Sequence, residues 1–232
     1  MNSTGERILA CLQQVAAERA SRAQDVALGQ RVALVKAFQH RRFAHTYADV
    51  LADARYAAAA RFFLEDLYGP SDFSERDQQF ARIVPALVRM FPNEIVDTVG
   101  DLAALHALSE QLDTAMARVG WTAPLGADGY AQAWRAVDRP ADRDRQIELM
   151  VGVGGALDRY TRSLLLRQSL RVMRSPARAA GLGALQQFLE RGFDTFRAMR
   201  GADGFLRMIA GRERALAAAL FSGAKPPDML GG

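Results

Sequence analysis

The sequence contains a single cysteine, Cys11, so the chain cannot form an internal disulfide. Disulfides persist in oxidising compartments, and a lone thiol therefore favours a reducing cytoplasm. Cys11 lies on an amphipathic segment, Glu6 to Ala20, where a small core residue is more typical than a nucleophile. We expect a cytoplasmic protein without a reactive cysteine.

Long apolar runs are also missing. No stretch approaches the ~18 apolar residues that a membrane-spanning helix needs. In the first twenty residues, Glu6 and Arg7 precede the apolar residues and Gln13 interrupts them. This pattern is typical of an amphipathic helix and not of a secretory signal. The sequence therefore predicts no membrane span.

Sustained alternation of apolar and polar residues, the mark of a strand, is absent as well. Apolar residues instead recur at helical spacing, as in Leu28, Val32 and Val35. The 232 residues are 50% hydrophobic and 24% charged, which is enough to bury a sizeable core. We expect an all-α protein, a compact single domain of about eight or nine helices with orthogonal or globin-like packing. This domain would cover residues 1–221, with a flexible Gly- and Pro-rich tail at 222–232.

Turn and capping signals divide the chain into expected helices. We expect a bend near residues 41–42, a kink or break at Pro85, and Pro176 in the first turn of its helix. The expected helices lie at about residues 6–20, 24–52, 56–68, 72–90, 93–119, 130–137, 142–174 and 176–199, with a last one that ends near 221.

The charge of the chain does not favour nucleic acid as a partner. The sequence pI is about 9.6, but the formal net charge is only +4. Only Lys36 and Lys225 are lysines, and the many arginines titrate so high that they inflate the pI. Such an arginine bias, with much alanine and glycine, is typical of a G+C-rich genome.

Residues 61–77 gather four aromatic and five acidic side chains around one Gly-Pro pair. Gly69 is typical of a helix C-cap, and Pro70 cannot continue a helix. Asp72 lies three residues before Glu75, which is the spacing of a capping box. The segment therefore predicts a helix–turn–helix corner.

The sequence of this corner also resembles the signature of a known protein family. Phe62-Phe63-Leu64-Glu65-Asp66-Leu67-Tyr68 resembles the signature of the bacterial FFLEELY-motif proteins, with Asp66 in place of the second glutamate. The likeness extends through Gly69-Pro70, Asp72-Phe73 and Arg76-Asp77 to Leu105-His106-x-Leu108-Ser109-x-x-Leu112-Asp113. That family has no established activity, so the resemblance implies a shared fold and adds nothing on function.

No recognisable catalytic or metal-binding motif occurs. His106, Glu110 and Asp113 share one helix face, yet no Glu-x-x-His or His-x-x-x-His pair could complete a metal site. A paired, half-buried histidine is the simpler interpretation. We therefore expect no metal and no cofactor.

Two further clusters have structural interpretations. Glycines 152, 154 and 155 follow no strand, so they do not form a phosphate loop. We expect them to allow close helix packing, with a local break as the alternative. Glu65 and Asp77 could converge across the turn as an acid–base pair, but capping and ion pairing are the favoured interpretation.

One electrostatic feature stands out between Arg159 and Leu189, where the chain has no acidic residue. Arg167, Arg171 and Arg174 are spaced to share one helix face. They could form a solvated face, pair with the acidic corner, or bind a partner. The six arginines of this segment, called the basic strip below, are Arg159, Arg162, Arg167, Arg171, Arg174 and Arg178.

These observations favour a non-enzymatic interaction or regulatory module, because they nominate neither a nucleophile nor a base. The basic strip would take a protein partner or an acidic ligand, and a homo-oligomer stays open. The expected interaction residues are Phe62, Tyr68, Asp77, Arg167 and Arg171.

The alternative is a helical bundle with an internal pocket for an apolar small molecule or cofactor. In this hypothesis His106 would be the only axial ligand. The other pocket residues would be Phe62, Phe63, Met150 and Gly154.

Overall fold

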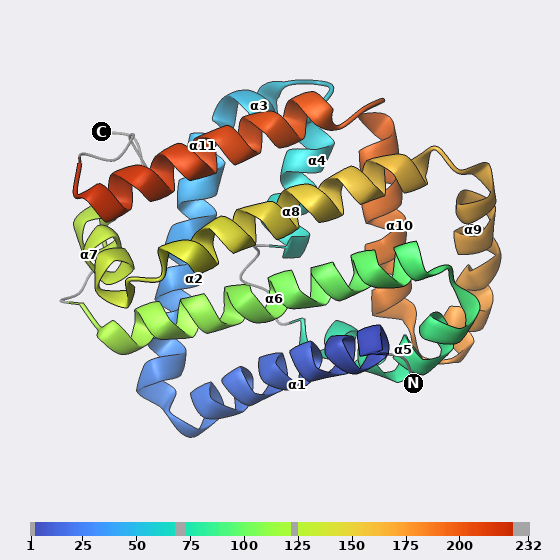
Figure 1. The fold of residues 1–232 in the computed structure, drawn as a ribbon, viewed down its shortest axis with the longest axis horizontal. Coiled ribbons are helices and arrows are strands. Elements are labelled where there is room, and N and C mark those ends of the chain that lie inside the picture. The colour runs from blue at the N-terminus through green and yellow to red at the C-terminus, as the bar shows by residue number, and fades with distance from the viewer. Residues whose placement is uncertain (1–2, 68–72, 122–124, 225–232) are drawn as a thin grey trace.

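The computed structural model describes residues 3–67, 73–121 and 125–224. Within these ranges the chain forms eleven α-helices and one π-helical turn, and no strand (Figure 1). The elements are α1 (Ser3–Gln24), α2 (Val26–Thr46), α3 (Ala48–Ala52), α4 (Ala57–Phe62), the π turn (Phe63–Leu67), α5 (Ser74–Met90), α6 (Asn93–Val119), α7 (Ala127–Val137), α8 (Pro140–Thr161), α9 (Leu164–Ala179), α10 (Gly183–Ala198) and α11 (Asp203–Ser222).

The helices form two crossed layers. Figure 1 shows α1, α6, α8 and α11 side by side across the molecule, and each packs on the next. Behind them α2 crosses toward one end and α10 toward the other, with α4 between. α9 lies at the outer edge, against α10 and the end of α8. The all-α fold and its orthogonal packing are confirmed, although eight or nine helices was too low a number.

Apolar side chains fill the space between the layers in several clusters. The largest joins α4, α8, α10 and α11 around Phe63, Phe196 and Phe205. A second cluster joins α2, α7 and α11, where the Phe38 and Tyr130 rings stack with centroids 4.4 Å apart. A smaller one binds α1 to α5 and α6. The polar cavity described below lies between the first two clusters.

Two predicted helices are each divided in the structure. The helix expected at 24–52 ends at Thr46, beyond the position of the expected bend, because Tyr47 turns inward and its hydroxyl donates to Glu213 at 2.8 Å. The helix expected at 142–174 ends at Thr161, and Ser163 caps a new one through the Leu166 amide at 3.3 Å. These tertiary and capping contacts account for part of the larger helix count.

Both helix-breaking prolines lie within helices. Pro176 was expected to open a helix, but it lies inside α9, which ends three residues later at Ala179. Pro85 lies inside α5, which continues to Met90 without the predicted break. A proline removes one backbone hydrogen bond, and here neighbouring turns and packing keep the helix intact.

The corner at residues 61–77 is only partly described. Its first helix is α4, which is followed by the π turn from Phe63. The sequence had predicted that the α-helix would continue through these residues. α5 begins at Ser74, with Phe73 at the N-cap and no side-chain capping bond. Gly69, Pro70 and Asp72, which carried the capping prediction, lie outside the described residues, as does most of the tail predicted at 222–232.

The glycines of α8 confirm close packing at one position. A Cβ on Gly154 would lie 2.5 Å from Leu206 Cδ2, so the missing side chain leaves room for Leu206 of α11 to pack directly on α8. Gly152 has open space around it. α8 runs through all three glycines, and the alternative of a local break is wrong.

Candidate functional site

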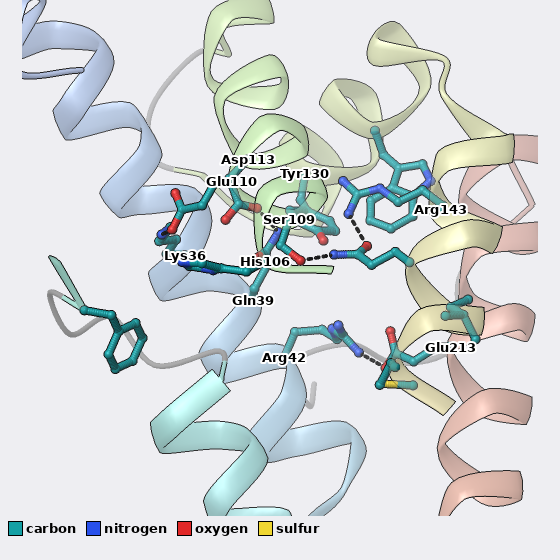
Figure 2. Close-up of a pocket in the computed structure, with 15 residues that line it drawn as sticks. Lys36, Gln39, Arg42, His106, Ser109, Glu110, Asp113, Tyr130, Arg143 and Glu213 are labelled. Atoms are coloured by element: carbon teal, nitrogen blue, oxygen red, sulfur yellow. Dashed lines mark hydrogen bonds and ion pairs between the residues drawn. The ribbon is translucent and has the colours of Figure 1, made fainter. Parts of the chain in front are cut away.

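A cavity of about 70 Å³ lies inside the bundle, where side chains from α2, α6, α7, α8 and α11 converge (Figure 2). Its walls are unusually polar for the centre of a helical protein. Lysine, arginine, carboxylate, amide, hydroxyl and imidazole groups all line it. Buried charges must be paired or hydrogen bonded, so the partners of each group define what the cavity can do.

The first wall is a buried ion cluster between α2 and α6. Lys36 Nζ donates to Glu110 Oε1 at 2.7 Å, and Arg22 of α1 bonds the other oxygen. Burial raises the pKa of Glu110, but the charges and hydrogen bonds of Lys36 and Arg22 outweigh it and lower the pKa to about 2. Glu110 is therefore ionised at neutral pH, and both of its oxygens are already engaged.

A second carboxyl group on α6 has the opposite character. Asp113 is buried, and its Oδ1 accepts a hydrogen bond from Gln39 Nε2 at 3.0 Å. Burial raises the pKa of Asp113, and the nearby charge of Glu110 adds to the rise. Burial likewise raises the pKa of the Tyr130 phenol. In both groups burial disfavours the charged form.

The third wall joins α2 to α11. Figure 2 shows Arg42 and Glu213 facing each other, and Arg42 Nη1 donates to Glu213 Oε1. The Tyr47 hydroxyl donates to the same carboxylate oxygen. Arg42 is only 7% exposed, and among the described residues no acceptor bonds its Nε.

The fourth wall is formed by α7 and α8. The Arg143 guanidinium stacks on the Trp134 ring at 3.8 Å and donates to Gln146 Oε1 at 3.1 Å. Gln146 in turn donates to Ser109 at 2.8 Å. Trp134 is 7% exposed, and no described residue accepts a hydrogen bond from its Nε1. Two buried donors, Arg42 Nε and Trp134 Nε1, thus belong to residues that line the cavity.

The predicted pocket residues divide between the cavity and the core. His106 and Met150 line the cavity. Phe62 instead packs against Gly192 and the Phe188 ring, Phe63 against Phe196 and Phe205, and Gly154 against Leu206. A cavity exists, but its lining is charged where an apolar one was expected.

Glu65 and Asp77, the described acids considered as an acid–base pair, do not pair with each other. Asp77 Oδ2 bonds His106 Nε2 and Arg19 Nη2, each at 2.8 Å. Glu65 pairs instead with Arg191 of α10 at 3.2 Å. His106 is thus the half-buried, paired histidine that was predicted. In the described ranges, no three His, Cys, Asp or Glu residues are grouped so as to hold a metal ion.

The predicted interaction residues do not form one surface. The Phe62 ring is buried in the core, Asp77 lies in the ion network, and Tyr68 lies outside the described residues. Arg171 is exposed on α9, and Arg167 beside it is half-buried. Arg174 pairs with Glu190 of α10 at 2.8 Å and not with the acidic corner.

Sequence reasoning missed most of the cavity, although α2 held a signal. Lys36, Gln39 and Arg42 each lie four residues after a buried apolar residue, at positions 32, 35 and 38. Their side chains therefore lie on the same face of α2 as these buried apolar residues. Lys36 is also one of only two lysines in the chain. Polar residues in the register of the core face are the pattern that could have found the site.

Fold and site together define an all-helical bundle with a polar internal cavity. In the part of the chain that the structure describes, no helix combines the length and apolar character needed to cross a membrane. Residues 18–227 match the family named domain of unknown function DUF8198, and the chain belongs to this family. Neither a curated protein nor a solved structure matches the chain.

Proposed function

We propose that the protein is a cytoplasmic, non-enzymatic binding module that takes a small polar molecule into its central cavity. The proposal is based on two buried donors, Arg42 Nε and Trp134 Nε1, for which the described residues supply no acceptor. An unsatisfied buried donor costs about 1–3 kcal/mol. A ligand that offers acceptors in the cavity would recover this cost.

The state of the carboxylates favours binding over catalysis. Glu110 is held between Lys36 and Arg22, and Glu213 accepts from Arg42 and Tyr47. A general base needs a carboxylate that can reach the proton of a substrate. These acids are engaged in holding helices together. The resemblance to the FFLEELY-motif proteins implies no activity, so the proposal depends on this geometry.

The position of the cavity supports a regulatory role. Arg42 belongs to α2 and Trp134 to α7, so a ligand that bonds both would link two helices. A molecule that binds only the folded state stabilises it in proportion to its saturation. Binding would therefore change the stability of the interfaces around α2 and α7, which a partner could sense.

The test is a thermal melt of purified protein with small polar probes of different charge: acetate, inorganic phosphate, acetamide and methylammonium. At tenfold excess over its dissociation constant, a ligand should raise the Tm by about 3–6 °C. Ser109→Leu places a branched apolar side chain in the cavity and should abolish the shift. Ser169→Leu on exposed α9 is the matched control and should retain it. If no probe shifts the wild-type protein, the cavity is not a ligand site for molecules of this class.

A second function is favoured by the exposed face of α9. Leu165 and Val172 are 72% and 74% exposed there, with Leu164 nearby. Isolated exposed apolar residues are ordinary, but a group of them on one helix is typical of an interaction site. Arg171 lies beside them. This face of α9 would suit a protein partner with an acidic, amphipathic segment.

Replacing Arg167 and Arg171 together with glutamine should weaken capture of such a partner several-fold, because rim charges guide association. The Tm should change little, since neither arginine forms an ion pair with another described residue that would hold the fold. Capture of an acidic amphipathic peptide and a thermal melt measure the two effects. The matched control, Arg61→Gln with Arg89→Gln, removes the same charge at other exposed positions. Equal loss in both variants would reduce the effect to net charge.

A further inference from the structure

The donors around the cavity indicate the chemistry of its ligand. Arg42 is bonded to Glu213 through Nη1, which leaves its Nε–H buried without a described acceptor. Arg143 Cζ lies 3.8 Å from the centroid of the Trp134 ring. The Trp134 Nε1–H is likewise buried without a described acceptor. A guanidinium N–H and an indole N–H can only donate. The ligand must therefore carry acceptors.

The remaining polar groups of the wall add to this donor character. The buried Tyr130 hydroxyl can donate a hydrogen bond, and burial raises the pKa of its phenol, while Asp113 Oδ1 already accepts from Gln39. Both oxygens of Glu110 accept, from Lys36 and Arg22, and Oε1 of Glu213 accepts from Arg42 and Tyr47. Among the described residues that line the cavity, the buried side-chain atoms without a partner are both donors, Arg42 Nε and Trp134 Nε1.

One of the two unpartnered donors belongs to a charged side chain, the Arg42 guanidinium. The cavity is lined by three cationic side chains, Lys36, Arg42 and Arg143, and by three acidic ones, Glu110, Asp113 and Glu213. Hydrogen bonds from charged donors to an ionised acceptor are about twice as strong as neutral ones. An anion therefore suits these donors better than a neutral molecule, and a cation offers them no acceptor.

The size of the cavity limits the ligand further. Benzene fills an engineered cavity of about 150 Å³. A volume of about 70 Å³ therefore admits a group of three to five heavy atoms, which is the size of a carboxylate or phosphate group. We propose that the cavity binds a small oxyanion, held by Arg42 from α2 and by Trp134 from α7. This inference rests on the proposed function, because it names the chemical class of that ligand.

Acetate and acetamide provide the sharpest comparison, because they have nearly the same shape and differ in charge. At matched ionic strength, acetate or inorganic phosphate should raise the Tm by about 3–6 °C at tenfold excess over its dissociation constant. Acetamide should give at least tenfold weaker binding, and methylammonium none. A larger shift with acetate than with phosphate would identify a carboxylate site, and the reverse a phosphate site.

Trp134→Phe tests the geometry, since it removes the Nε1–H and keeps an aromatic ring beneath Arg143. Acetate or phosphate should bind about tenfold more weakly, because a hydrogen bond to a charged acceptor is lost. Without ligand, the loss of an unsatisfied buried donor opposes the loss of indole packing, so each Tm shift is measured from the variant's own ligand-free Tm. Trp121→Phe is the matched control, because Trp121 packs outside the cavity, and it should bind as the wild type does.

The outcomes distinguish the proposal of an oxyanion ligand from the more general proposal that the cavity binds a small polar molecule. If acetamide binds as well as acetate and Ser109→Leu abolishes both, the cavity is a ligand site but not an oxyanion site. If neither anion nor acetamide shifts the Tm, both proposals fail. If anions bind equally well to the Trp134→Phe and Trp121→Phe variants, the anion lies elsewhere and the assignment to this cavity is wrong.

Discussion

Replacing Phe63 with alanine is expected to lower the free energy of unfolding by about 3–5 kcal/mol. Phe63 is 2% exposed and lies between two other rings. Its centroid is 6.3 Å from that of Phe196 and 5.6 Å from that of Phe205, the latter in an edge-on arrangement. The substitution removes this packing and leaves a cavity where the π turn meets α10 and α11. Urea unfolding followed by circular dichroism measures the loss.

Phe91→Ala provides the control for this prediction. Phe91 is 39% exposed at the turn between α5 and α6, so its removal should cost about 1 kcal/mol or less. The difference between the two variants isolates the burial of the Phe63 ring. A Phe63→Ala protein as stable as the Phe91→Ala protein would mean that the motif aromatics do not hold the bundle together.

The local signals of the sequence were sufficient for some elements. α6 begins at Asn93 and ends at Val119, as predicted, because Phe91-Pro92-Asn93 stops one helix and starts the next. The close approach at Gly154 also follows from a local property, the missing side chain. Where a boundary depends on capping residues or turn chemistry, the residues that decide it are neighbours in the chain.

Other features depend on residues that are distant in sequence. The end of α2 depends on Tyr47, which reaches Glu213, 166 residues later. The acids of the corner were predicted to cap helices or form ion pairs. Asp77 and Glu65 do form ion pairs, with Arg19 and Arg191. Which arginine each acid meets depends on how the layers cross, and local spacing cannot predict it.

The cavity is the clearest example of this limit. Its walls come from five helices, and each contributes polar residues that look like ordinary surface positions in isolation. Glu110 and Asp113 were considered as metal ligands because they share a face with His106. Only the fold shows that Lys36 reaches Glu110 and that Gln39 reaches Asp113. In the structure these two residues instead form an ion cluster, at Glu110, and a buried acid, at Asp113.

Replacing Glu110 with glutamine is expected to be as damaging as the loss of the Phe63 ring. Lys36 and Arg22 both bond this carboxylate, and glutamine would leave two cations in the bundle without their common anion. Removing one partner of a buried ion pair costs about 3–5 kcal/mol. Urea unfolding at pH 7 measures the loss. Glu148→Gln removes an exposed carboxylate paired with Arg145 and should cost about 1 kcal/mol or less.

The pH dependence of this loss separates lost charge from lost shape. The pKa of Glu110 is about 2 in the folded protein and about 4.5 when unfolded, so the unfolded state takes up its proton first as the pH falls. The charge of Glu110 therefore adds about 3 kcal/mol of stability above pH 4.5, and this is lost progressively between about pH 4.5 and 2. Glu110→Gln lacks that contribution at every pH. The stability gap between wild type and variant should thus be constant from pH 7 to about 5 and narrow below 4.5. A gap that stays the same down to pH 3 would mean that glutamine disturbs the packing and that Lys36 and Arg22 do not depend on the charge of Glu110.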